Sequence, residues 1–92
     1  MGLTIAINYL EDYIVIYPNP NRGTFNIDTK LLPIDRIEIY DISGRLLFDF
    51  VEENNGAILL ELEKILPSGV YIVIVSSAMC TYTQKIVVST RD

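Results

Sequence analysis

Turn-forming residues interrupt this sequence at intervals of roughly 8 to 12 residues. The clearest interruptions are Asn19–Gly23, Ser43–Gly44, Asn54–Gly56 and Pro67–Gly69. Proline lacks the backbone N–H that a helix interior or a central strand needs, while glycine and asparagine tolerate the positive φ of tight turns. The chain can therefore form only short elements, and the sequence predicts an all-β domain with no long helix.

Between these turns, apolar and polar residues alternate with the period of two that is typical of half-buried strands. Thr24–Asp28, for example, places Phe25 and Ile27 on one face and polar residues on the other. The same alternation runs through the three segments that follow. Side chains predicted to share the core-facing side of their strands are Phe25, Ile27, Ile37, Ile39, Leu46, Phe48, Phe50, Ile58, Leu60 and Leu62.

Three further segments complete the predicted strands. Ile14–Tyr17 is β-branched and aromatic, and it ends at Pro18 and Pro20, which cannot donate to a continuing ladder. Val70–Val75 is apolar on both faces, as expected of a central strand that is covered from both sides. Thr81–Val88 closes the domain as the last strand.

Turn chemistry defines the connections. Gly44 is expected to take the left-handed position of a hairpin, and Asn54–Gly56 favours a type I′ turn between two further strands. Glu61–Leu66 has the composition of a helix, but Pro67 limits it to about one turn. We expect a tucked loop at this point.

About seven short strands follow from this pattern, and they suit an immunoglobulin-like antiparallel β-sandwich. An open-edged barrel is the alternative architecture. The 92 residues leave room for one domain. We assign that single sandwich to residues 14–92 and interpret residues 1–13 as an N-terminal tether or a cloning remainder.

Composition excludes several classes of function. Hydrophobic residues make up 50% of the chain and charged residues 21%, which is the composition of a folded domain. A net charge of −5 without a basic cluster argues against nucleic acid as a partner, because phosphate binding needs grouped Lys and Arg. The apolar run Val70–Val75 is far shorter than the roughly 20 residues of a membrane-spanning helix, so no membrane span is expected. Met1–Leu10 lacks the features of a signal peptide, so an export signal would belong to a longer precursor.

The residues offer little for catalysis or cofactor binding. The chain has no histidine, which excludes a Ser-His-Asp triad, and its one cysteine, Cys80, has no activating partner. There is no Gly-rich phosphate loop and no zinc ligand set, so we expect no catalytic residue, no metal and no cofactor. Calcium stays open as an alternative, with ligands drawn from Asp28, Asp35, Asp41 and Asp49. A carbohydrate platform of tyrosines also stays open, although packing explains them as well, for Tyr17, Tyr40, Tyr71 and Tyr82.

Spaced motifs, each at the point where a predicted strand meets a turn, extend over most of the chain. They are Tyr17-Pro18-Asn19-Pro20 with Gly23, Ile39-Tyr40-Asp41-Ile42-Ser43-Gly44-Arg45, Leu66-Pro67-Ser68-Gly69-Val70-Tyr71, and Lys85-Ile86-Val87-Val88. In their order and spacing, these motifs resemble the C-terminal sorting domains of the type IX secretion system of Bacteroidetes. The motif and recognition residues that the resemblance implies are Pro18, Asn19, Pro20, Gly23, Gly44, Gly69, Tyr71, Lys85, Ile86, Val87 and Val88.

The resemblance implies a non-catalytic signal at the end of a secreted protein. Such domains direct an N-terminal cargo domain through type IX secretion, by way of the periplasm, to the cell surface or the medium. In the family, an outer-membrane shuttle protein binds the domain, and a cell-surface sortase commonly cuts it off before the cargo is attached to lipopolysaccharide. The alternative is a structural or adhesive immunoglobulin-like accessory module of a secreted enzyme, with carbohydrate binding as one variant.

Several motif residues receive specific expected roles. Tyr71 is expected to bond its hydroxyl back to the preceding turn, as in the tyrosine corner of immunoglobulin-like folds. Gly44 and Gly69 are expected to need positive φ. Lys85 lies on an edge strand, where it either deters edge-to-edge pairing or takes part in recognition. As a hypothesis, a partner reads the terminal strand by strand addition, with Lys85 and the apolar residues after it as the contact set.

Overall fold

The computed structural model describes residues 14–29, 33–51, 57–77 and 81–90. The predicted turn at Asn54–Gly56, Cys80 and the tether at residues 1–13 lie outside these ranges. Within them the chain forms strands and no helix. In chain order the strands are β1 (Val15–Tyr17), β2 (Thr24–Asp28), β3 (Arg36–Asp41), β4 (Leu46–Phe50), β5 (Ala57–Glu61), β6 (Gly69–Ser76) and β7 (Thr81–Val88).

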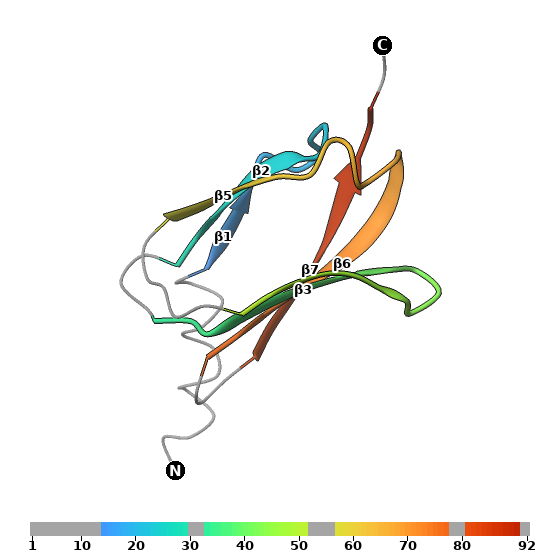
Figure 1. The fold of residues 1–92 in the computed structure, drawn as a ribbon. Helices are drawn as coiled ribbons and strands as arrows, with labels where there is room; N and C mark the ends of the chain where they lie inside the picture. Colours follow the sequence, from blue (N-terminus) through green and yellow to red (C-terminus); the bar gives the residue numbers. More distant parts are fainter. Residues whose placement is uncertain (1–13, 30–32, 52–56, 78–80, 91–92) are drawn as a thin grey trace.

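Two antiparallel sheets pack face to face (Figure 1). One sheet has three strands in the order β1-β2-β5, and the other has four in the order β4-β3-β6-β7. This arrangement confirms the predicted all-β, immunoglobulin-like sandwich. The apolar strand β6 lies inside its sheet, as predicted, and β7 lies at the edge.

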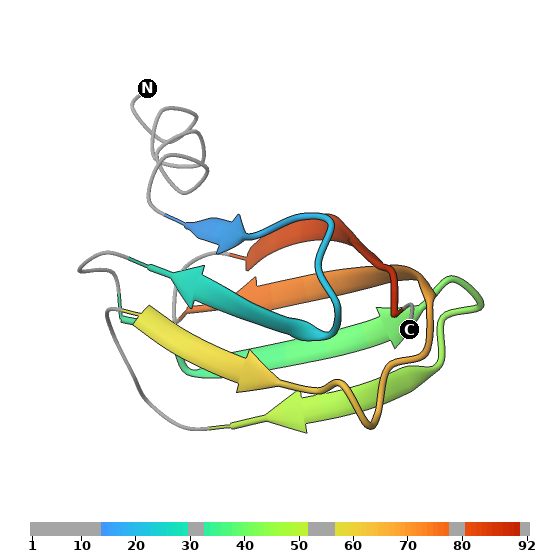
Figure 2. The ribbon, with the colours of Figure 1, turned by 90° about the horizontal axis from the view of Figure 1, so that it is seen from above.

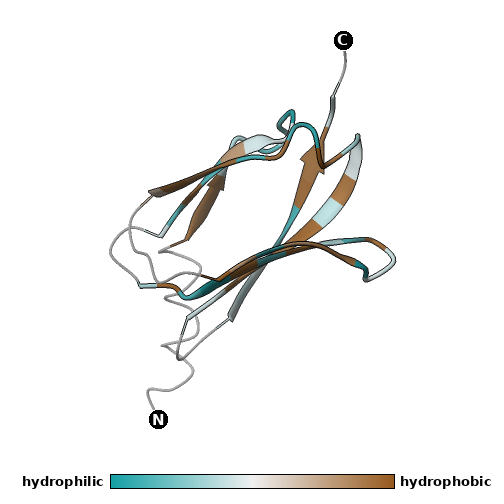
Figure 3. Cartoon of the chain, in the orientation of Figure 1, coloured by the Kyte–Doolittle hydropathy of each residue, from teal (hydrophilic) through white to brown (hydrophobic). Residues whose placement is uncertain are grey.

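The core lies between the sheets and takes alternate side chains from each strand. Figure 3 shows hydrophobic strands joined by more polar turns. Each fully buried large apolar side chain contributes about 1.5–3 kcal/mol to folding. The predicted core residues of β2, β3 and β5 are confirmed, together with Leu62 directly after β5. The buried apolar residues are Ile14, Ile16, Phe25, Ile27, Ile34, Ile37, Ile39, Ile58, Leu60, Leu62, Leu66, Tyr71, Val73, Val75, Ile86 and Val88.

Strand β4 departs from the predicted alternation. Consecutive residues of β3 pair with Phe48 and Leu46, so Leu47 is an extra residue that forms a β-bulge. Because of the extra residue, the side chains that precede the bulge point to the opposite faces of the sheet from those predicted. Leu46 is therefore 43% exposed, while Leu47 packs against the core. The prediction that Leu46 shares a face with Phe48 and Phe50 is therefore wrong. The two phenylalanines do lie on one side, with ring centroids 6.4 Å apart.

A compact turn joins β3 to β4. The Asp41 carboxylate accepts hydrogen bonds from the Ser43 hydroxyl (2.6 Å), the Ser43 N–H (2.9 Å) and the Arg45 N–H (3.0 Å). These hydrogen bonds, the one from the Ser43 hydroxyl above all, lower the pKa of Asp41 because they favour its charged form. Gly44 has a φ of +92°, which confirms the positive φ predicted for it.

The connection before β6 makes the single turn that was predicted. The Leu66 N–H donates to the Leu62 carbonyl (2.9 Å), and the Leu66 side chain is buried in the core. The Tyr71 hydroxyl then donates to the carbonyl of Pro67 (2.5 Å), which confirms the predicted tyrosine corner. Burial of the ring raises the pKa of Tyr71, since desolvation disfavours the phenolate.

The glycines at the other turns differ in what they require. Gly23 has a φ of +106°, and a Cβ added there would lie 2.8 Å from the Cα of Glu63. Gly69 has no positive φ, and a Cβ added there would meet the Tyr71 hydroxyl at 3.5 Å, an ordinary contact. The prediction that Gly69 needs positive φ is therefore wrong, because this residue already belongs to the extended strand β6.

Alanine substitutions at the glycines should separate backbone strain from steric conflict. Gly44→Ala should cost about 1–2 kcal/mol of unfolding free energy, because only the positive φ opposes it. Gly23→Ala should cost about 3 kcal/mol or more, since the backbone at Glu63 must also move. Gly69→Ala is the matched control and should stay within about 1 kcal/mol of the native protein. Urea unfolding measures all three, and equal losses at Gly23 and Gly69 would contradict the geometry.

Removal of one hydroxyl should weaken the tyrosine corner. Tyr71→Phe should cost about 1–2 kcal/mol, because the Pro67 carbonyl loses its donor. The difference in unfolding free energy between the two proteins should shrink above a pH of about 10. There Tyr71 ionises more readily in the unfolded native chain than in its folded state, so the native protein loses stability and the variant does not. Thermal unfolding at neutral and alkaline pH measures both effects. A deficit that grows with pH would contradict the raised pKa.

Candidate functional site

The sequence motifs meet at one end of the sandwich (Figure 2). In the four-stranded sheet, Asp41 pairs with Tyr71, and Tyr71 pairs with Ile86. In the loops above it, the Gly23 carbonyl accepts a hydrogen bond from the Leu62 N–H (2.7 Å). We call this region the motif end, and it consists of residues Pro18–Gly23, Asp41–Arg45, Leu66–Tyr71 and Lys85–Val88.

The terminal strand β7 divides its last residues between the core and the surface. Ile86 and Val88 are buried at 0% and 1% exposure, whereas Lys85 and Val87 point away from the core and are exposed. The buried pair fixes the strand in place, because each side chain would lose its packing if the strand shifted by one residue. Of the predicted contact set, only Lys85 and Val87 are therefore accessible to a partner of the folded domain.

The side chain of Asn19 occupies the outer edge of β7. Its Nδ2 donates to the Lys85 carbonyl (3.0 Å), and its Oδ1 accepts from the Val87 N–H (2.9 Å). One side-chain amide thus replaces the backbone groups of a neighbouring strand. Strand addition at these residues, as hypothesised from the sequence, would require Asn19 to leave.

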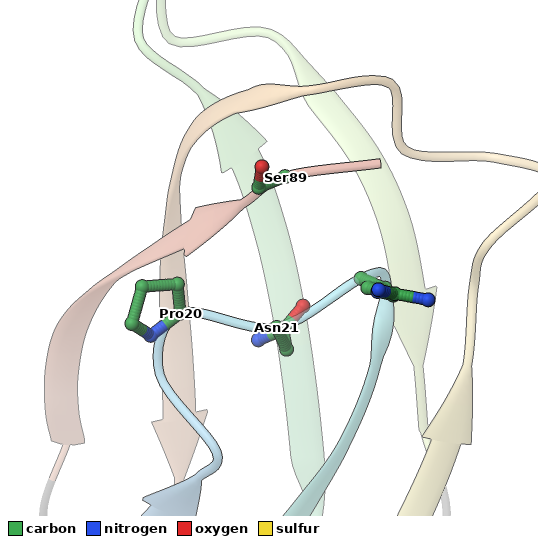
Figure 4. Close-up of a pocket in the computed structure, with 4 residues that line it drawn as sticks. Pro20, Asn21 and Ser89 are labelled. Atoms are coloured by element: carbon green, nitrogen blue, oxygen red, sulfur yellow. The ribbon is translucent and has the colours of Figure 1, made fainter. Parts of the chain in front are cut away.

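The backbone of Asn21 continues this edge contact. Its N–H donates to the Val87 carbonyl (2.9 Å), and its carbonyl accepts from the Ser89 N–H (2.8 Å), which forms a short parallel bridge beside the strand. We call Asn19 and Asn21 together the asparagine clamp. In Figure 4 the segment that carries Pro20 and Asn21 runs beside the end of β7, where Ser89 lies, and a hollow opens on this surface. The residues that line the hollow are Pro20, Asn21, Arg22 and Ser89.

The buried side chain of Asn21 holds its own loop in shape. Its Nδ2 donates to the Pro18 carbonyl (3.0 Å), and its Oδ1 accepts from the Gly23 N–H (2.8 Å). Sequence analysis placed Asn21 in the Asn19–Gly23 turn but did not select it as a site residue. No periodic pattern distinguishes Asn21, because its side chain bonds within its own loop while only its backbone contacts β7.

Residues after the last apolar position are also anchored. The Thr90 N–H donates to the Ser68 hydroxyl (2.8 Å), and the Ser68 and Thr90 hydroxyls are hydrogen-bonded to each other (2.8 Å). Ser68 belongs to the turn before β6, so the chain beyond β7 is tied to a second motif. Sequence analysis did not identify this link, since short polar side chains carry no pattern that names a distant partner.

Ion pairs of the described residues lie on β3, β4 and the turn between them. Arg36 pairs with Asp49 (3.0 Å), and its hydrogen bond lowers the pKa of that carboxylate. Arg45 pairs with Asp41 across the hairpin turn (3.4 Å). These are exposed pairs, which typically add only about 0–1 kcal/mol each, so they shape the local surface more than they stabilise the fold.

The segments around the terminal strand carry only positive charge. Residues 13–27 and 64–90 contain no Asp or Glu, although the net charge of the chain is −5. Their charged residues are Arg22, Lys64 and Lys85. Neither Arg22 nor Lys85 takes part in an ion pair within the part of the chain that the structure describes. Arg22 and Lys85 therefore place positive charge beside the terminal strand of an acidic molecule.

Among the described residues, hydrogen-bonding groups and charged side chains are what this site offers a partner. No group of three side chains that could hold a metal ion gathers among them. Neither do they contain a helix long and apolar enough to cross a membrane. Of the tyrosines at described positions, Tyr71 is buried, while the hydroxyls of Tyr40 and Tyr82 donate to Glu38 (3.1 Å) and Gln84 (2.6 Å) at separate places.

The asparagine clamp should be visible in amide hydrogen exchange. The Val87 N–H should be protected in the native protein, because Asn19 accepts its hydrogen bond. Asn19→Asp should speed its exchange about tenfold or more, since a carboxylate cannot donate to the Lys85 carbonyl and the clamp opens. The Ile86 amide is the internal control, as it bonds within the sheet. Unchanged protection of Val87 in the variant would contradict the clamp.

Comparison with known proteins agrees with the architecture. The family model described as "Secretion system C-terminal sorting domain" matches residues 15–89. A solved structure of PorZ, described as an essential bacterial surface component of the type IX secretion system of Porphyromonas gingivalis, is similar over 90% of this chain, with a TM-score of 0.69 and 20% identity. The matched part is 12% of that PorZ chain. At this identity the likeness shows the fold alone. No curated protein matches this sequence.

The family match covers all of the described strands and every motif at the motif end. Because most of the chain is matched, the domain belongs to the secretion system C-terminal sorting domain family and is a C-terminal sorting signal for type IX secretion.

Proposed function

We propose that this domain is a non-catalytic address that an outer-membrane shuttle protein reads after the precursor reaches the periplasm. A cell-surface sortase then separates it from the N-terminal cargo. The family relationship supports a role at the C-terminal end of a cargo that uses the secretion machinery. The absence of histidine from the chain supports a role without catalysis, because a serine or cysteine would have no imidazole base.

The observation that carries the proposal is the exposed pair of Lys85 and Val87 on a strand fixed by the buried Ile86 and Val88. A charge and an apolar group are thereby presented at a fixed spacing on a rigid edge. A partner can bind such a pair without ordering a flexible segment, which lowers the entropic cost of recognition.

The other motif residues support this surface in our proposal. Asn19 holds the backbone of Lys85 and Val87, and Pro18, Pro20 and Gly23 shape the loop that carries Asn19. The remaining motif residues, Gly44, Gly69 and Tyr71, keep the neighbouring turns in place. Of the motif residues, only Lys85 and Val87 are proposed to touch the shuttle protein.

Export of a reporter tests this function. A secreted reporter fused upstream of the domain should reach the cell surface of a type IX-competent bacterium. Lys85→Glu combined with Val87→Glu should reduce the surface signal about tenfold or more and leave the reporter in the periplasm, because both accessible groups are altered. Surface labelling and cell fractionation measure the outcome. If the domain were instead a structural or adhesive module, the alternative function, the reporter would stay in the periplasm even with the native domain.

Two controls separate recognition from folding. Lys64→Glu removes another exposed cation outside β7 and should leave export within about twofold of the native domain. Thermal unfolding of each isolated variant should show a native-like midpoint. Truncation before Lys85 is a poor test, because it also deletes Ile86 and Val88 from the core. Native export of the double variant would overturn the proposal.

A further inference from the structure

We propose that the first half of β7, residues Thr81–Lys85, docks an extended acidic segment of a partner protein by strand addition. This inference deepens the proposed function and rests on it, since it names a second contact on the same terminal strand. It also relocates strand addition away from Lys85–Val88, where the asparagine clamp already fills the edge.

Backbone geometry identifies the open groups. Val87 turns both its N–H and its carbonyl toward the clamp, and Lys85 turns its carbonyl the same way. In an antiparallel pair, alternate residues aim both backbone groups to the same side. The N–H and carbonyl groups of Thr81 and Thr83, and the N–H of Lys85, therefore face outward. None of these groups has a hydrogen-bond partner among the described residues.

The edge of β7 suits strand addition better than the other sheet edges. Strand β7 has 8 residues, and its register against β6 runs from Thr81 to Val88 without a shift. By contrast, β1 has 3 residues and β5 has 5. Strand β4 also has 5 residues and carries a bulge, which discourages edge pairing. A longer strand that has no bulge and carries unpaired groups is the better template.

Charge identifies the occupant. Lys85 borders the open groups, forms no ion pair with a described residue, and lies in the region from 64 to 90 that has no Asp or Glu. A second copy of this chain paired antiparallel about Thr83 would add another Lys85 to the same small interface and no acid. An acidic strand instead places a carboxylate across from Lys85, and opposite charges on neighbouring strands stabilise pairing. The outward-facing threonines beside it favour β structure.

Binding of a defined peptide tests the inference on the whole 92-residue chain. The probe is a synthetic peptide of alternating threonine and glutamate, about seven residues long, and the control probe replaces glutamate with lysine. In an NMR titration the acidic peptide should shift the amides of Thr81, Thr83 and Lys85 and should bind about tenfold more tightly than the lysine peptide. Shifts at β4 or β5 instead would overturn the site.

Two variants isolate the backbone and the charge. Thr83→Pro removes only an outward N–H, which an edge strand tolerates, and should weaken binding about tenfold, whereas Thr83→Val keeps that N–H and should bind within about twofold of the native chain. Lys85→Glu should reverse the preference between the two peptides, which keeps the inference testable if the proline variant does not fold. Equal binding by the native and Thr83→Pro chains, or dimerisation through the same amides, would overturn it.

Failure here is distinguishable from failure of the proposed function. If the peptide does not bind while export still depends on Lys85 and Val87, strand addition is rejected and the proposed sorting role is retained. If the peptide binds at Thr81–Lys85 but the double variant is exported normally, docking at the edge is retained and recognition through Lys85 and Val87 is rejected.

Discussion

The terminal strand keeps its place because its backbone is hydrogen-bonded on both sides over its last residues. On one side it pairs with β6, and on the other the asparagine clamp substitutes for a missing strand. An unpaired backbone group costs free energy when it is withdrawn from water, so an amide side chain that supplies both a donor and an acceptor suits such an edge. The position of Lys85 and Val87 on the surface depends on this two-sided support.

The same constraint explains why the motifs gather at one end. The four-stranded sheet aligns Asp41, Tyr71 and Ile86 across neighbouring strands, and the Pro18–Gly23 loop closes over the last of these strands. Each motif supplies a turn or a hydrogen bond that another motif needs. The motifs therefore describe one structural unit.

Much of the sandwich could be predicted from the sequence because strand periodicity and turn chemistry are local. Phe25 and Ile27 alternate with polar neighbours, Gly44 marks a left-handed turn, and Tyr71 follows the turn that it stabilises. Leu46 could not be placed correctly, because a one-residue bulge leaves the composition of the strand unchanged while reversing its faces. Gly69 looked like a turn glycine only because it directly follows Pro67 and Ser68.

The site was less predictable than the fold. The terminal residues were named from the resemblance, but burial divides them into an inner and an outer pair that sequence order alone does not distinguish. The clamp could not be found at all from local patterns, since Asn19 and Lys85 are 66 residues apart and an asparagine carries no sign of its distant partner. The periodicity of a strand predicts which of its side chains face the core, whereas the contact between Asn19 and β7 depends on the tertiary arrangement of the loop and the strand.

The link between Asn19 and β7 joins the first turn of the domain to its last strand. A polypeptide that is released from the ribosome before β7 is synthesised contains Asn19 but lacks the backbone groups of Lys85 and Val87 to which it bonds. The domain is thus completed only by its final stretch, which makes the address a record of full-length synthesis: prematurely terminated precursors never acquire it.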